Sequence, residues 1–425
     1  MKKIRIPIGG LILAMTVFLS ACVPQGYQAW SVEPLPSRTQ ESDEMTLALK
    51  DVEQQSRESI LRDDCYTYAF ERLSSAEQIW YQDIAAILGV MAENVKLSEE
   101  GLIQGLNEEA VDKIFQSVLI DHPELFYVEG YSYTKYTVGE KLVAIEFTGT
   151  YSMPWESACE RMQEISDRAE EILQAAPETS DDYSKVKYVY DTLILETDYD
   201  RSAPDNQNIY SVFVGRASVC QGYAKAFQYL LNRMSVDCTL VQGEVIETGE
   251  GHAWNLVNAD GAFYYVDVTW GDISYRSAED ADGENDAGAV KAPDISEWIS
   301  YDYFCITEDQ LLRTHLPDDT LQLPECNAMA DNYYVRENAF FTGYDKEQIK
   351  ELVERRVAEG QQSETGDIII ALCCADESCF QEFCGKLLDT QQLFRYLEGT
   401  GIETFIYSCD DKQYTLTFFM VTTGQ

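Results

Sequence analysis

The sequence contains little positive charge and few histidines. Its 425 residues include 31 Lys and Arg against 74 Asp and Glu, which gives a formal net charge of −43 at pH 7. So acidic a surface repels phosphate backbones and anionic headgroups. We therefore exclude nucleic acid as a partner and otherwise interpret the acidity as a solubility device. Only three histidines, His122, His252 and His315, are available as general bases.

The chain shows no internal repeat, and its N-terminal apolar run is too short and wrongly flanked for a membrane span. This run, Ile6–Leu19, follows three basic residues, which is typical of a signal peptide over residues 1–21. It ends in Leu-Ser-Ala-Cys, which resembles a bacterial lipobox. We therefore expect Cys22 to carry lipid and to anchor an extracytoplasmic protein to the bacterial cell membrane, with residues 22–58 as a tether. A secreted protein with a chance cysteine at this place is the alternative.

The cysteines form neither a metal motif nor a disulfide framework. Ten of the twelve remain when Cys22 and Cys220 are set aside. Export would permit disulfides, but the spacings match no framework, so we expect buried free thiols. Cys379 and Cys384 are poorly spaced for one metal, and the acidic loop 280–286 does not place its glycine where an EF-hand needs it. We predict no metal and no cofactor.

Cys220 is predicted to open an amphipathic helix. The apolar positions that follow it have helical spacing, and Ser218 with Gln221 matches a capping-box pattern. A thiol in the first helical turn loses its proton more easily, because free N–H groups and the helix dipole favour an anion. Gly222 would let another backbone or a substrate come close. Alternatively, Cys220 is simply the first core position of the helix.

His252 is expected on a strand downstream of Cys220, with Asp267 on the next strand. A four-residue loop over 258–261 would place His252 opposite Asp267, whereas a tight Asp260-Gly261 turn would place Trp254 there. In the first register the carboxylate holds one imidazole nitrogen while the other nitrogen faces the thiol. The other histidines are expected at a helix-to-strand corner (His122) and at the end of a helical stretch (His315).

Three ordered blocks resemble the transglutaminase-like superfamily. They are Val219-Cys220-Gln-Gly-Tyr-Ala, His252-Ala-Trp-Asn and Tyr265-Val-Asp267-Val-Thr-Trp, within a close match over about residues 185–272. The resemblance implies an α+β, papain-like core with a Cys220–His252–Asp267 triad. It also implies a thioester acyl-enzyme that crosslinks, deamidates or hydrolyses peptide or protein amides.

The remaining segments are predicted from their apolar periodicity. Residues 59–155 are expected to be mostly helical with a hairpin over 131–150, 156–325 to hold the transglutaminase-like domain, and 332–425 to form a small α+β domain. The last domain is predicted to contain one helix over 376–398. We assign a second oxyanion donor to Gln207 or Asn208 and a cleft-lining role to Trp254 and Trp270, although turn and core roles are the alternatives.

The sequence therefore predicts a surface-anchored cysteine enzyme whose substrate is a peptide or protein, such as a cell-wall peptide. Hydrolysis is favoured over crosslinking, because the protein works in water and no amine-acceptor site is visible. One alternative is a non-catalytic binding lipoprotein, which a buried Cys220 or an Asp267 far from His252 would favour. Another is a disulfide-stabilised structural lipoprotein in which Cys220 is oxidised.

Overall fold

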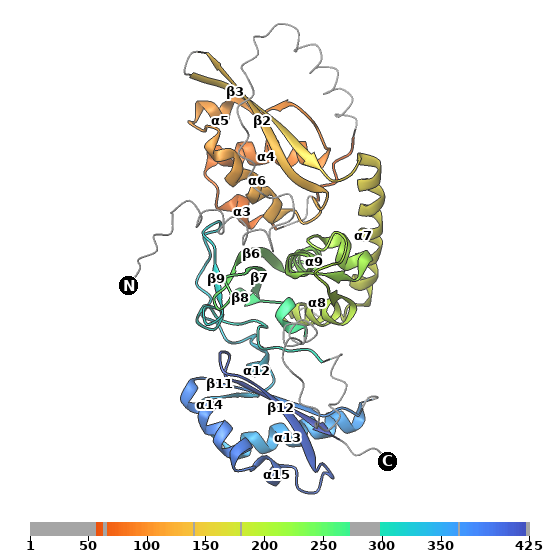
Figure 1. Ribbon diagram of the computed structural model, residues 1–425, viewed down its shortest axis with the longest axis vertical. Helices are drawn as coiled ribbons and strands as arrows, with labels where there is room; N and C mark the ends of the chain where they lie inside the picture. Colours follow the sequence, from red (N-terminus) through yellow and green to blue (C-terminus); the bar gives the residue numbers. More distant parts are fainter. Residues whose placement is uncertain are drawn as a thin grey trace, which may run out of the picture. The chain divides into compact units, whose positions relative to one another are not determined.

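The computed structural model describes residues 57–62, 66–138, 141–178, 181–272, 298–363 and 366–421. The predicted signal peptide, Cys22, most of the tether and the acidic loop lie outside the described residues. The chain divides into two compact units. Figure 1 labels helices and strands of both units. The first contains the chain up to Gly261 with Asp267–Thr269 and His315–Pro324; the second contains Ala262–Val266, Trp270–Thr314 and the chain from Glu325. Within the described ranges no helix is long and apolar enough to cross a membrane.

The first unit begins with helices and a hairpin, as the sequence predicted. The helices are α3 (Tyr68–Glu71), α4 (Ser75–Gly89), α5 (Glu99–Ile103) and α6 (Glu109–Asp121). A capping box formed by Ser74 and Glu77 starts α4. The predicted hairpin is confirmed as β2 (Val128–Val138) and β3 (Lys141–Tyr151), and a short strand, β1 (Val95–Lys96), pairs with β3. His122 ends α6, so the predicted corner is confirmed.

The rest of the first unit builds a helix-on-sheet core. Its elements are α7 (Trp155–Ala175), α8 (Asp182–Glu196), β4 (Asp198–Tyr199), η1 (Ser211–Gly215), β5 (Ala217–Ser218), α9 (Cys220–Arg233), β6 (Asp237–Val245), β7 (Gly251–Ala259) and β9 (His315–Pro317). With β8 (Ala262–Val266), these strands give a sheet of order β8-β7-β6-β9. The pairs β6–β7 and β6–β9 are antiparallel, and α9 packs against β6 and β7.

Helix α9 is buried on all sides over most of its length. Every residue from Cys220 to Leu231 is buried, including the polar side chains of Gln221, Lys225 and Gln228. A helix with an exposed polar face was predicted, and this part of the prediction is wrong. The Gln228 amide N–H donates to the Ile120 carbonyl at 2.8 Å, whereas the side-chain oxygens of Gln221 and Gln228 are buried without a hydrogen-bond partner among the described residues. The helix therefore lies inside the domain core, with Cys220 at its first residue.

The second unit holds an α+β region. The short η2 (Thr269–Gly271) begins in the first unit and ends in the second. The other elements of the second unit are α11 (Glu308–Leu311), α12 (Tyr333–Arg336), β10 (Phe340–Phe341), α13 (Lys346–Gln362), β11 (Ile369–Cys374), α14 (Glu377–Phe383), η3 (Cys384–Asp389), α15 (Leu393–Tyr396), β12 (Thr404–Asp410) and β13 (Thr415–Val421). The sheet order is β10-β11-β13-β12. The predicted helix over 376–398 is confirmed in part, but it is not continuous. After α14 the chain passes into the π-helical η3, which ends at Asp389, and α15 follows Gln391, whose φ of 54° is left-handed.

Candidate active site

Cys220 begins α9 without the predicted cap. The N-cap residue is Val219, with an extended backbone and no side-chain hydrogen bond to the helix. Ser218 belongs to β5 instead, and its hydroxyl donates to the Asn206 carbonyl at 2.8 Å. The capping box of Ser218 and Gln221 is therefore wrong. Val219 provides no side-chain cap, and the start of α9 is the positive end of its helix dipole, which suits a site for negative charge.

Gly222 allows a loop to approach the start of α9, as predicted. A Cβ at this position would lie 1.9 Å from Ser218 Oγ and about 3 Å from two backbone carbonyls, at 3.0 Å from Asn206 and 3.1 Å from Asn208. The Val219 N–H also donates to the Asn206 carbonyl at 3.1 Å. Gln207 lies between Asn206 and Asn208 in the chain, and its buried Oε1 has no hydrogen-bond partner among the described residues. Its role as an oxyanion donor stays a prediction.

The thiol itself is buried. Cys220 is 1% exposed and lies in an apolar cluster with Ala224, Leu240 and Ala253. Ala253 follows His252 on β7, so the start of α9 and the histidine strand share one buried cluster.

His252 and Asp267 meet, although not through the predicted register. The loop between β7 and β8 has two residues, Asp260 and Gly261, whose φ values of 49° and 85° are typical of a type I′ turn. This tight turn places Trp254 opposite Asp267 and makes His252 the diagonal neighbour, which a long side chain still reaches. His252 Nε2 lies 2.6 Å from Asp267 Oδ2. The four-residue loop was wrong, but the predicted pair forms, with Asp267 one residue beyond the end of β8.

His315 joins this pair, which the sequence did not predict. It begins β9 instead of ending a helix, and its side chain is 0% exposed. Its Nε2 lies 3.2 Å from the same oxygen, Asp267 Oδ2. The rings of His252 and His315 are 5.3 Å apart between centroids, and the Trp254 ring meets that of His315 edge-on at 5.0 Å.

Charge compensation decides the ionisation of this cluster. Burial alone would raise the pKa of Asp267, but the charge and hydrogen bond of His252 and the hydrogen bond of His315 hold it well below the usual value. Burial lowers the pKa of His315 and outweighs its bond to Asp267. Asp267 is therefore a carboxylate, and neutral His315 donates its Nε2–H to it.

These three side chains also form a group that a metal ion could bind. Tetrahedral Zn²⁺ with bonds of about 2.0–2.2 Å needs ligand atoms about 3.4 Å apart. The 2.6 Å contact between His252 and Asp267 is shorter than that spacing. The observed spacing thus fits hydrogen bonds between the side chains better than ligands around an ion.

Two further side chains hold the cluster in place. Asn255, from the His252-Ala-Trp-Asn block, donates to the Ala224 carbonyl of α9 at 2.9 Å and so ties β7 to the cysteine helix. The Tyr190 hydroxyl donates to the Asp267 carbonyl at 3.4 Å. The only sequence signal for Asn255 was an amide at a strand position that faces the core.

The two tryptophans predicted to line a cleft have different surroundings. Trp254 is 0% exposed and stacks on His252 at 5.9 Å between ring centroids, so it packs the site from within. Trp270 is half-buried in the second unit and meets Tyr303 edge-on at 4.8 Å. Their contact with a substrate stays a prediction.

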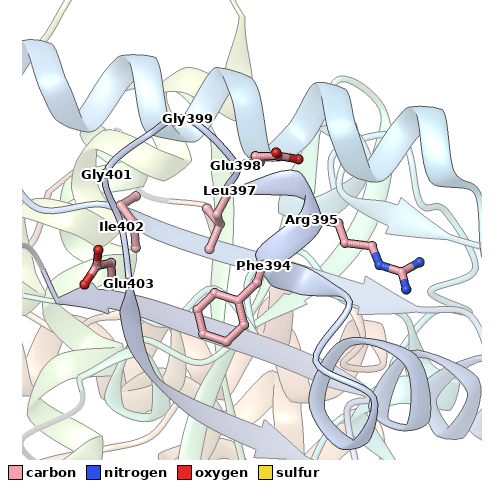
Figure 2. A pocket seen from close by; sticks show the side chains of 8 residues that line it. All are labelled: Phe394, Arg395, Leu397, Glu398, Gly399, Gly401, Ile402 and Glu403. Atoms are coloured by element: carbon pink, nitrogen blue, oxygen red, sulfur yellow. The ribbon is translucent and has the colours of Figure 1, made fainter.

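The second unit also contains a hollow of about 380 Å³ (Figure 2). Figure 2 shows that its lining comes from one short segment, α15 and the loop after it. The residues that line it include no thiol, imidazole or hydroxyl group. It therefore offers no cysteine chemistry of its own.

The structure thus combines an α+β domain, a cysteine at the start of a buried helix and a His–Asp pair on the adjoining sheet. Residues 168–268 match the family model of the transglutaminase-like superfamily, so the chain carries a transglutaminase-like domain. No curated protein matches the chain.

Two solved structures are similar to parts of the chain. One, described as a TGase, is 16% identical with a TM-score of 0.25, and the matched region covers 39% of this chain and 47% of the TGase chain. The other, described as "a Putative Cysteine Protease from Cytophaga hutchinsonii", is 12% identical with a TM-score of 0.23, and the matched region covers 32% of this chain and 61% of the other chain. The chain thus spans about half to three-fifths of these neighbours.

Proposed function

We propose that the transglutaminase-like domain is a cysteine enzyme that acts on peptide or protein amides. Cys220 is the nucleophile, His252 the base and Asp267 the residue that orients the base. The observation that carries this proposal is the buried 2.6 Å contact between His252 Nε2 and Asp267 Oδ2, on a strand that packs against the helix opened by Cys220.

The chemistry follows from which nitrogen of His252 contacts Asp267. Because Nε2 is held by the carboxylate, Nδ1 takes the proton from the Cys220 thiol. The thiolate attacks the amide carbonyl carbon, and the resulting oxyanion faces the Cys220 backbone N–H at the uncapped helix start. The C–N bond then breaks, the leaving amine takes the proton from His252, and a thioester remains on Cys220.

The thioester is resolved by water or by an amine. Water, deprotonated by His252, gives a carboxylic acid and restores the thiol, whereas an amine gives a new amide. We favour hydrolysis, because water is abundant outside the cell and no amine-binding site is identified among the described residues. Lipid attached to Cys22 would hold the enzyme at the outer face of the bacterial membrane, where cell-wall peptides are available substrates.

A second candidate function rests on the burial of Cys220. A thiol that is 1% exposed inside an apolar cluster fits a domain that keeps the fold for binding alone. In that case Cys220 is a small core side chain, and the domain recognises a peptide or protein without cutting it.

The rate of alkylation of Cys220 by iodoacetamide, measured from about pH 4 to pH 9, separates the two functions. Other thiols are followed by peptide mapping, and His252→Ala is the matched variant. The enzyme predicts a thiolate that forms well below the reference pKa of about 8.5 and loses this property in the variant. Slow modification with an ordinary pKa, unchanged by His252→Ala, would refute the enzyme and support binding.

A further inference from the structure

His315 reaches the catalytic carboxylate through the strand order of the sheet. Strand β6 lies between β7 and β9, and it pairs Gly243 with His252 on one side and Val245 with His315 on the other. Gly243 makes this close packing possible, because a Cβ there would lie 2.2 Å from the Leu316 carbonyl oxygen and 2.7 Å from the Trp254 ring. The fold thus brings two histidines, far apart in the chain, to one aspartate.

We propose that His315 is a positioning residue that fixes the Asp267 carboxylate for His252, so that the site works through four side chains and not three. This inference rests on the proposed function of the site. One oxygen, Asp267 Oδ2, meets both imidazoles, at 2.6 Å from His252 and 3.2 Å from His315. A simple base–orienter pair needs only the first of these contacts.

The position of Asp267 explains why a second contact is needed. Asp267 lies one residue past the end of β8, and the Tyr190 hydroxyl donates to its backbone carbonyl, so the side chain is held by contacts other than the ladder of β8. Its side chain is 1% exposed, so a carboxylate there is stable only while donors compensate its charge. Without His315, the carboxylate would keep one fewer donor and turn more easily away from His252.

Loss of His315 should therefore weaken the hold of Asp267 on protonated His252. The thiolate–imidazolium pair of Cys220 and His252 would then form at higher pH. The shift expected from losing one hydrogen bond to the charged form is about one pH unit. A role in packing alone would not move this midpoint.

The test compares His315→Phe with His315→Gln in the full chain. Phenylalanine keeps a ring against Trp254 but removes the N–H, whereas glutamine keeps a donor at about the place of Nε2. Alkylation of Cys220 is measured against pH for both variants, for wild type and for His252→Ala. We expect the midpoint to rise by about one unit in His315→Phe and to stay near wild type in His315→Gln. Urea unfolding confirms that both variants are folded.

The outcomes separate the two proposals. An ordinary thiol midpoint in wild type would overturn the enzyme and, with it, the role of His315. A low wild-type midpoint that stays unchanged in His315→Phe, or that moves equally in both variants, would overturn the role of His315 alone. Proton NMR gives a second readout, because only three histidines contribute. The downfield Nε2–H signal of His252 should move in His315→Phe, and an unmoved signal would contradict the proposal.

Discussion

Gly222→Ala should destabilise the domain, even though alanine is the better helix former. The added Cβ would lie 1.9 Å from Ser218 Oγ, and turning that hydroxyl away breaks its bond to the Asn206 carbonyl. Overpacking costs about 1–3 kcal/mol, and a broken buried hydrogen bond adds about 1 kcal/mol. The helix gains about 1 kcal/mol from replacing glycine. The net loss in the free energy of unfolding is therefore about 1–3 kcal/mol.

Urea unfolding of four proteins measures this effect: wild type, Gly222→Ala, Ser218→Ala and the double variant. Removing Ser218 Oγ takes away the nearest clash, so the double variant should lose less stability than the two single variants added together. Gly385→Ala is the matched control, because a Cβ there meets nothing within 4 Å. A neutral Gly222→Ala, or strictly additive variants, would refute the close packing of the 206–208 loop on α9.

Asp267→Asn should keep the fold but slow the alkylation of Cys220 near neutral pH by at least tenfold, because an amide cannot stabilise the charge on His252; a rate within twofold of wild type would contradict this. Asn255→Ala should lower the free energy of unfolding by about 1–3 kcal/mol, since the Ala224 and Thr239 carbonyls lose the hydrogen bonds of the Asn255 amide, and urea titration measures the change. Stability should also fall above about pH 8.5. Burial raises the pKa of Cys238, Cys305 and Cys326, the last to about 12, so only the unfolded chain releases these protons there. Burial lowers the pKa of Lys225 to about 8, so this one residue favours the folded state as the pH rises, against the effect of the three cysteines. Melting temperatures that stay level between pH 8 and 10 would refute the prediction.

Local patterns in the sequence predicted the elements that carry the site. Helical spacing after Cys220 and alternation around His252 depend on neighbours in the chain, and both elements are confirmed at these residues. The cap at Ser218 failed because the hydroxyl found a partner in the Asn206 loop, a contact between segments that no local pattern contains.

The hairpin shows how a wrong local choice can still lead to the right contact. The tight turn at Asp260 and Gly261 moved His252 by two residues relative to Asp267, from the opposite to the diagonal position. A shift of two residues keeps side chains on the same face of a sheet, whereas a shift of one would have separated them. The prediction of the pair was therefore less sensitive to loop length than the prediction of the register.

His315 marks the limit of this reasoning, because its role depends on the strand order of the sheet. Its strand has three residues and follows Asp267 by 48 positions, too short and too distant for periodicity to place it. Removal of Cys220 abolishes alkylation at that position whether the domain is an enzyme or a binding domain. Variants at His315 are therefore more informative. Two imidazoles converge on one buried carboxylate, Asp267, and the proposed function gives this convergence a role in holding His252. The pH midpoint of Cys220 in His315→Phe is therefore the measurement that connects this arrangement to catalysis.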